Sequence, residues 1–201
     1  MLTSIDICNK AKAVAAEKTL YVKGGMGNKL SQKNKLRFSN NDIYNIKRTN
    51  LIFAADEDTK AYDEFGLLSA VSGYNCRTMG EVMCLCEDIS KDFTSILPGE
   101  VVFMKDRIGI FVGDGKVVTV NPFGVGETIV DGWVSHGKLP EVQYTDLVPE
   151  APVQEVVEDG EGKVDGDVEE PSEDETGEAE VNTEEKASKV EVRPSSFRRR
   201  H

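Results

Sequence analysis

Residues 98–120 read PGEVVFMKDRIGIFVGDGKVVTV, and this stretch decides the fold. It holds three short runs rich in β-branched and aromatic residues, at 101–104, 108–112 and 117–120, a composition typical of strands. Asp114-Gly115 separates the last two runs and predicts a tight hairpin. The stretch therefore predicts an antiparallel β-meander, and residues 128–130 and 142–147 are weaker strand candidates.

Helical patterns dominate the chain before this stretch. A hydroxyl cap and an early acid in Thr3-Ser4-Ile5-Asp6 predict the start of a first helix. Residues 31–53 are expected to be helical in pieces, and a further helix is expected to begin near Asp63 and to end at Gly73. Residues 79–86 predict another short helix. Helices followed by a meander indicate an α+β domain over residues 1–149.

The charge is distributed unevenly. Residues 150–201 carry 17 acidic and 7 basic residues, whereas residues 1–149 carry 19 acidic and 17 basic residues. Residues 150–201 therefore have a net charge of −10, and residues 1–149 have a net charge of −2 (17 − 19). A nearly neutral body gives no electrostatic case for nucleic-acid binding. The acidic segment, which ends in an Arg-rich run, is expected to be disordered, and its most plausible partner is a basic surface.

The four cysteines are Cys8, Cys76, Cys84 and Cys86. They form no Cys-x-x-Cys pair and have no accompanying histidine set, so no metal site and no cofactor is expected. The sequence also shows no secretory signal and no apolar run long enough to span a bilayer. These features predict free thiols in a reducing cytoplasm.

Three stretches, the last of them in two parts, together resemble the NlpC-type, papain-like cysteine peptidases with which phages of Gram-positive bacteria cut peptidoglycan. They are residues 19–25, residues 34–68 in several pieces, residues 98–118 and residues 133–140. The resemblance covers about the first three quarters of the chain and depends on the order and spacing of the pieces. It implies a papain-like fold in which N-terminal helices pack on an antiparallel β-meander.

The residues that carry catalysis in that family are absent here. Its nucleophilic cysteine follows an aspartate at a helix start, where the helix N-terminus lowers the thiol pKa. In this chain Asp63 is followed by Glu64, and the strand that should begin with the catalytic histidine begins with Arg107. Asn121 is a loose candidate for the third polar position. A carboxylate cannot replace the thiolate, and an arginine cannot act as a general base.

Two residues match family positions that line the cleft and hold the stem peptide, Tyr21 and Asp63. They are candidates for substrate binding, although packing of Tyr21 and helix capping by Asp63 are the favoured explanations for each residue taken singly. If the backbone is that of the family, Glu64 and Arg107 should face each other, and we expect them to form an ion pair. His136 lies in a Trp-x-x-His-Gly run and is expected to be structural.

These features favour a catalytically inactive relative of a phage cell-wall peptidase, acting as a binding or structural module. An active peptidoglycan endopeptidase or amidase with another catalytic arrangement is the alternative, and a decaying prophage remnant is a third reading. The expected partners are a peptidoglycan stem peptide or a virion protein, with no membrane and no nucleic acid. The expected location is the host cytoplasm or the virion.

Overall fold

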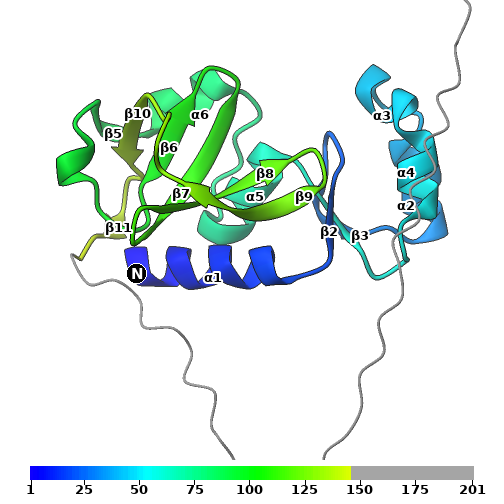
Figure 1. Ribbon diagram of the computed structural model, residues 1–201, viewed down its shortest axis with the longest axis horizontal. Coiled ribbons are helices and arrows are strands. Elements are labelled where there is room, and N and C mark those ends of the chain that lie inside the picture. Colours follow the sequence, from blue (N-terminus) through cyan, green and yellow to red (C-terminus); the bar gives the residue numbers. More distant parts are fainter. Residues whose placement is uncertain (146–201) are drawn as a thin grey trace, which may run out of the picture. The chain divides into compact units, whose positions relative to one another are not determined.

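A six-stranded antiparallel sheet is the centre of the fold in the computed structural model, which describes residues 1–145 (Figure 1). Its strands lie in the order β5-β10-β6-β7-β8-β9. Their bounds are Glu87–Ser90 for β5, Val101–Met104 for β6, Arg107–Gly113 for β7, Lys116–Asn121 for β8, Gly124–Ile129 for β9 and Ser135–Lys138 for β10. The helices described below complete a mixed α+β architecture, as the sequence predicts.

The predicted meander is confirmed as β6-β7-β8, continued by β9. Asp114 and Gly115 form the β7–β8 turn with φ angles of 52° and 66°, a left-handed conformation that a tight hairpin requires. Side chains alternate between the two faces of the sheet. Val101 and Phe103 enter the main hydrophobic core, whereas Val102 packs with Trp133 on the opposite face. The central strands are therefore buried on both faces.

Two helices cover the main-core face of the sheet, α1 (Ser4–Ala16) and α5 (Glu64–Ser72). A capping box starts α1, because the Thr3 hydroxyl accepts a hydrogen bond from the Asp6 backbone N–H and the Asp6 carboxylate accepts one from the Thr3 backbone N–H, each 3.1 Å long. Gly73 ends α5 in the left-handed conformation, as predicted. Figure 1 shows α1 running along the sheet.

Residues 19–62 form a smaller layer of structure. A three-stranded sheet in the order β2-β4-β3 packs beside three short helices. The elements are β2 (Thr19–Tyr21), β3 (Met26–Lys29), β4 (Lys60–Tyr62), α2 (Gln32–Phe38), α3 (Ile43–Lys47) and α4 (Thr49–Ala54). The buried Lys35 ammonium joins α2 to the end of α4 by donating to the carbonyls of Phe53 (3.2 Å) and Ala55. The break predicted at Asn40-Asn41 separates α2 from α3.

The remaining elements correct the sequence prediction in several places. Among the described residues, the sequence analysis did not predict six strands: β1 (Leu2–Thr3), β2, β3, β4, β5 and β10. Two short pairs are parallel rather than antiparallel, β2 with β4 and β1 (Leu2–Thr3) with β11 (Val142–Gln143). Helix α6 (Met79–Leu85) ends one residue before the predicted limit. Strands of two to four residues are too short to show the alternation by which a strand is recognised in a sequence.

The predicted disorder of residues 150–201 lies outside the described residues, as does the part of the 142–147 strand candidate beyond Thr145. Within residues 1–145, no helix combines the length and the apolar character that crossing a membrane requires.

Candidate functional site

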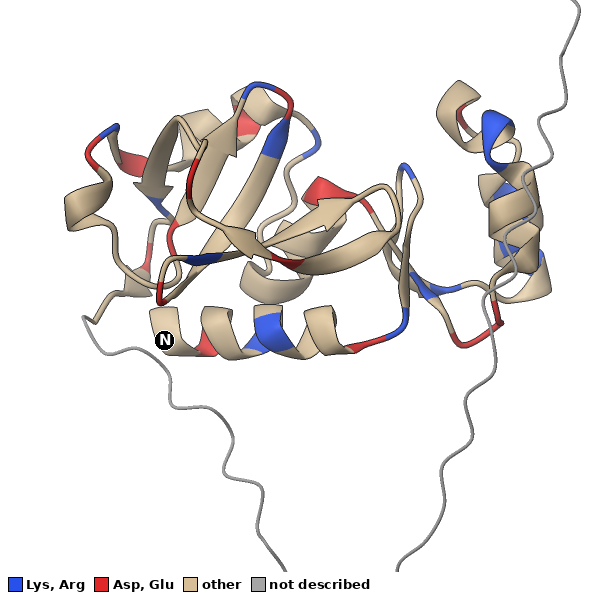
Figure 2. Ribbon diagram, in the orientation of Figure 1, with Lys and Arg blue, Asp and Glu red and all other residues tan. Residues whose placement is uncertain are grey.

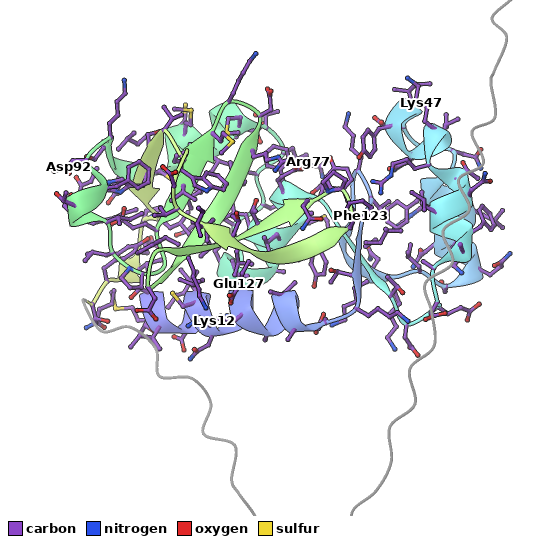
Figure 3. The ribbon with its side chains drawn as sticks, in the orientation of Figure 1. Lys12, Lys47, Arg77, Asp92, Phe123 and Glu127 are labelled. Atoms are coloured by element: carbon purple, nitrogen blue, oxygen red, sulfur yellow. The ribbon has the colours of Figure 1, made fainter. Side chains whose placement is uncertain are left out.

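A cleft of about 420 Å³ opens beside the start of α5. One wall is the first turn of this helix, a second is the segment between α5 and α6, and a third is the loop between β2 and β3. The residues that line it are Tyr21, Lys23, Gly24, Met26, Asp63, Glu64, Phe65, Gly66, Asn75, Cys76 and Arg77. Figure 3 labels Arg77 on the segment that leads into α6. Three of the five residues singled out from the sequence, Tyr21, Asp63 and Glu64, therefore meet at one cleft.

Asp63 holds two parts of the cleft wall together. It is the N-cap of α5, and one carboxylate oxygen accepts a 2.7 Å hydrogen bond from the Gly66 backbone N–H. The other oxygen accepts a 2.7 Å hydrogen bond from the Gly24 backbone N–H in the β2–β3 loop. Both oxygens are thus occupied by backbone donors, which accounts for the aspartate as a capping residue without any ligand.

The first turn of α5 and the β2–β3 loop also touch directly, at Gly66 and Gly25. A Cβ atom built on Gly66 would lie 1.9 Å from the Gly25 carbonyl oxygen, and a Cβ on Gly25 would lie 2.7 Å from the backbone of Ala61. No side chain fits at either position, so α5 starts directly against the loop. The residue before the glycine pair, Lys23, forms a 3.1 Å ion pair with Asp42.

Glu64 is the first residue of α5 and is partly buried in the cleft wall. Burial, with a smaller contribution from the neighbouring Asp63 charge, raises the pKa of the Glu64 carboxyl. Its own backbone N–H and a side-chain hydrogen bond with Tyr21 oppose this shift. Burial and the nearby Glu64 charge in turn raise the pKa of the Tyr21 hydroxyl. The Tyr21 hydroxyl and the Glu64 carboxyl therefore affect each other's pKa in the cleft.

Arg107 and Asn121 lie outside the set of residues that line this cleft. Arg107 is exposed at the start of β7, and its charge affects the Glu64 carboxyl only weakly. The expected Glu64–Arg107 ion pair is wrong: among residues 1–145, neither side chain has an opposite charge within 4.0 Å. Asn121 ends β8, and its side-chain oxygen accepts a 2.8 Å hydrogen bond from the Phe123 backbone N–H.

An aromatic cluster flanks the cleft. The rings of Tyr21 and Tyr44 meet edge to face with centroids 5.1 Å apart, and the Arg48 guanidinium lies 5.2 Å from the Tyr44 centroid. Arg48 also donates to the Tyr44 hydroxyl (3.0 Å) and to the carbonyl of Pro122 in the β8–β9 turn. This arginine therefore links the helical layer to the main sheet beside Tyr21.

A buried pair of polar side chains, His136 and Glu100, lies in another part of the molecule, at the main sheet. His136 on β10 contacts the Glu100 carboxylate through Nδ1, and its Nε2 lies 3.0 Å from the Asp92 carbonyl oxygen. Because a carbonyl only accepts, Nε2 must carry a proton. Both ring nitrogens are engaged, so His136 cannot activate a thiol in this arrangement. Burial raises the pKa of the nearest candidate thiol, Cys86, to about 12, which keeps it protonated.

Sequence reasoning missed most of the cleft. The resemblance at Tyr21 and Asp63 pointed to two of its walls. Asn75, Cys76 and Arg77 come from a segment with no regular structure and no recognisable motif, so their sequence carried no signal. The partner of His136, Glu100, was also missed. It directly precedes an apolar strand, and a glutamate is rarely buried there unless it has a partner.

In residues 1–145, no group of three or more His, Cys, Asp or Glu side chains is arranged to hold a metal ion. No protein-family model matches this chain, and neither the curated proteins nor the solved structures yield a match.

Proposed function

We propose that this protein is a non-catalytic binding module with an NlpC-type, papain-like fold, derived from a phage cell-wall peptidase. The observation that carries the proposal is the position of Glu64. It stands at the first turn of α5, in the wall of a cleft, where the resemblance would require a nucleophilic cysteine. A carboxylate cannot perform that acyl transfer, whereas the cleft itself is open to a ligand.

The arrangement of the elements supports this proposal. Helix α5 packs on the antiparallel sheet, and β7 begins at Arg107, in the order expected from the resemblance. The alternative, a peptidase with relocated residues, is disfavoured because His136 has both nitrogens engaged and the Cys86 thiol is protonated. A stem peptide or a virion protein is the proposed ligand class of the cleft.

Hydrolysis is the first test. Purified peptidoglycan is incubated with the protein, and newly released amino groups are measured. We expect no release above a buffer blank, and the same result for a variant carrying both Glu64→Ala and Arg107→Ala. Release that survives in this double variant would show that catalysis occurs elsewhere. Release that is lost in it would show that Glu64 and Arg107 perform a different chemistry at the same site.

Binding is the second test. Insoluble peptidoglycan is sedimented with the protein, and the bound fraction is measured. Met26→Trp adds bulk at an exposed position in the cleft wall, so we expect it to reduce the bound fraction. Ile129→Trp adds similar bulk at an exposed position on β9 and serves as the matched control. Equal binding by both variants would exclude the cleft as the contact surface.

A further inference from the structure

We infer that an exposed apolar patch on α3 and the β8–β9 turn binds the surface of an anionic lipid bilayer. Four side chains define the patch, with exposed fractions of 81% for Phe123, 65% for Ile43, 48% for Ile46 and 36% for Tyr44. Clustered exposed apolar side chains, unlike single ones, mark a surface that meets a partner or a membrane. None of the four lines the cleft beside α5, so the inference goes beyond the proposed function and is independent of it.

Helix α3 turns one side toward the body of the protein and the other toward solvent. Its inner side is fixed by the buried Asn45, whose side chain accepts a 3.0 Å hydrogen bond from a backbone N–H of the β2–β3 loop and donates a 2.9 Å hydrogen bond to a carbonyl there. At about 100° per residue, Ile43 and Lys47 lie almost opposite Asn45. Tyr44 and Ile46 lie between these two directions, one on each side of the helix. The outer face of α3 is therefore apolar with one cation.

Arg48 joins this face to the β8–β9 turn. Its guanidinium donates a 3.0 Å hydrogen bond to the Tyr44 hydroxyl and another to the carbonyl of Pro122, the residue before Phe123. The Phe123 backbone N–H is itself held by the Asn121 side-chain oxygen at 2.8 Å. Figure 3 labels Phe123 on this turn and Lys47 on α3. The exposed phenylalanine and the outer face of α3 are therefore neighbours on one surface.

The charge of the helical layer favours an anionic partner. Residues 32–54 hold five basic residues and one acidic residue, a net charge of +4 (5 − 1), so the rest of residues 1–149 has a net charge of −6 (−2 − 4). The one acid, Asp42, forms a 3.1 Å ion pair with Lys23, whereas Lys47 forms none among the described residues. Salt screens charges over about 8 Å, so the local charge decides what this surface attracts, despite the net charge of −12 on the whole chain.

The shape of the patch favours a bilayer over a protein partner. None of its four apolar side chains lines the cleft beside α5 or the two shallower hollows of residues 1–145. A protein interface needs side chains that interlock at the packing density of a protein interior, whereas fluid lipid adapts to apolar side chains that protrude. Apolar and aromatic side chains beside cations are typical of surfaces that lie in the headgroup layer of anionic membranes.

The sequence, which lacks a spanning apolar run, predicts no membrane contact. A surface of this kind lies on a bilayer and does not cross it, so it needs no such run. The apolar side chains of the patch enter the headgroup layer, and the Lys47 ammonium meets the lipid phosphates.

Vesicle sedimentation tests the inference. The full-length protein is mixed with vesicles that contain phosphatidylglycerol and phosphatidylcholine in equal parts, or phosphatidylcholine alone, and the bound fraction is measured against lipid concentration. We expect saturable binding to the anionic vesicles and at least tenfold weaker binding to the neutral ones. Binding to the anionic vesicles should weaken as the salt concentration rises, because the attraction is partly electrostatic.

Matched variants make the test specific to the patch. Ile43→Ser should weaken vesicle binding at least threefold, whereas Ile129→Ser should leave it unchanged; the two isoleucines are 65% and 66% exposed, and Ile129 lies on β9. Lys47→Gln should also weaken binding at least threefold, whereas Lys10→Gln removes a charge from an exposed position on α1 and should not. All four positions are exposed, so each variant is expected to fold.

A tryptophan reporter tests insertion directly. Phe123→Trp places an indole at the most exposed position of the patch, while the natural Trp133 is buried and already shielded from water. We expect the fluorescence emission of this variant to shift to shorter wavelength when anionic vesicles are added, and the emission of the unchanged protein to stay constant. Binding without that shift would contradict the insertion of the turn.

No binding to anionic vesicles, equal binding to neutral ones, or full binding by Ile43→Ser would each overturn the inference. A dimer that forms without lipid and dissociates in Ile43→Ser, in a protein that binds no vesicles, would assign the patch to a second copy of this chain instead. Neither the hydrolysis of peptidoglycan nor its binding in the cleft enters these measurements, so the proposed function stands or falls separately.

Discussion

Two glutamates of this protein stand in opposite physical situations. Glu100 is 1% exposed, and both carboxylate oxygens are engaged, by His136 and by the Leu97 backbone N–H at 3.2 Å. Glu64 is partly buried in the wall of a cleft, and among the described residues its carboxylate has no cation within 4.0 Å. In Figure 3, Asp92, which accepts from His136, lies far from Arg77 at the cleft.

The difference separates a carboxylate whose oxygens all have partners inside the fold from one that lines an open cleft. A buried charge is tolerated when every oxygen has a partner, and removing one partner leaves the others stranded. A partly buried charge without a cation costs stability in the free protein and gains it when a cation binds. Figure 2 shows that acidic residues are spread over the whole body, so acidity alone would not have distinguished the two.

The largest effect is expected at Glu100. Glu100→Ala should lower the free energy of unfolding by about 3–5 kcal/mol, because it strands the His136 ring and the Leu97 backbone N–H. Urea denaturation measures the change. Glu100→Gln is the matched variant: its amide can donate to Nδ1 and still accept from Leu97, so we expect a much smaller loss. Equal losses for alanine and glutamine would contradict the hydrogen-bonding role.

Asp63 should come next. Asp63→Ala removes the α5 cap and the link to Gly24, and we expect a loss of about 2 kcal/mol in the free energy of unfolding. Asp63→Asn keeps one acceptor oxygen and should fall between alanine and wild type. Amide exchange at Gly24 and Gly66 should accelerate in both variants. Unchanged exchange at these two amides would show that the aspartate does not join the loop to the helix.

Glu64 should give a smaller effect of opposite sign. The pKa of its carboxyl is raised in the folded protein, so ionisation disfavours folding above that pKa, and the wild type gains stability as the pH falls through it. Glu64→Gln should therefore stabilise the protein at neutral pH by less than about 1 kcal/mol, because the group is partly hydrated. The gain should vanish in acid, where the wild-type carboxyl is protonated. Urea denaturation at neutral and acidic pH measures it, and a gain that persists in acid would reject the electrostatic explanation.

The smallest effect concerns Glu64 and Arg107 together. Since no ion pair joins them, a double-mutant cycle of Glu64→Gln and Arg107→Ala should give a coupling energy below about 0.5 kcal/mol. Thermal or urea unfolding of the four proteins provides the cycle. A coupling energy well above this value would mean that the two charges meet in solution.

The sequence predicted the parts of the fold that have a strong local signal. The hairpin at Asp114-Gly115 and the capped starts at Thr3 and Asp63 each depend on a few adjacent residues with a defined backbone role. The β2-β4-β3 sheet could not be predicted, because its strands have only three or four residues and β2 pairs with β4 across 41 positions of sequence (60 − 19). The predicted Glu64–Arg107 ion pair was wrong for a similar reason. The direction of a side chain depends on packing that a motif does not specify.

The contact between Gly66 and Gly25 has a consequence for how this site could change in evolution. A side chain at position 66 would displace the loop, and a shorter residue at position 63 would release it. Position 64 bears neither restriction, because its partly buried side chain lines the cleft and does not join the helix to the loop. Mutation could therefore change residue 64, while selection for folding alone preserved Asp63 and Gly66 on either side of it. Under the proposed function, a peptidase ancestor could lose its nucleophile in one step and keep the surrounding cleft.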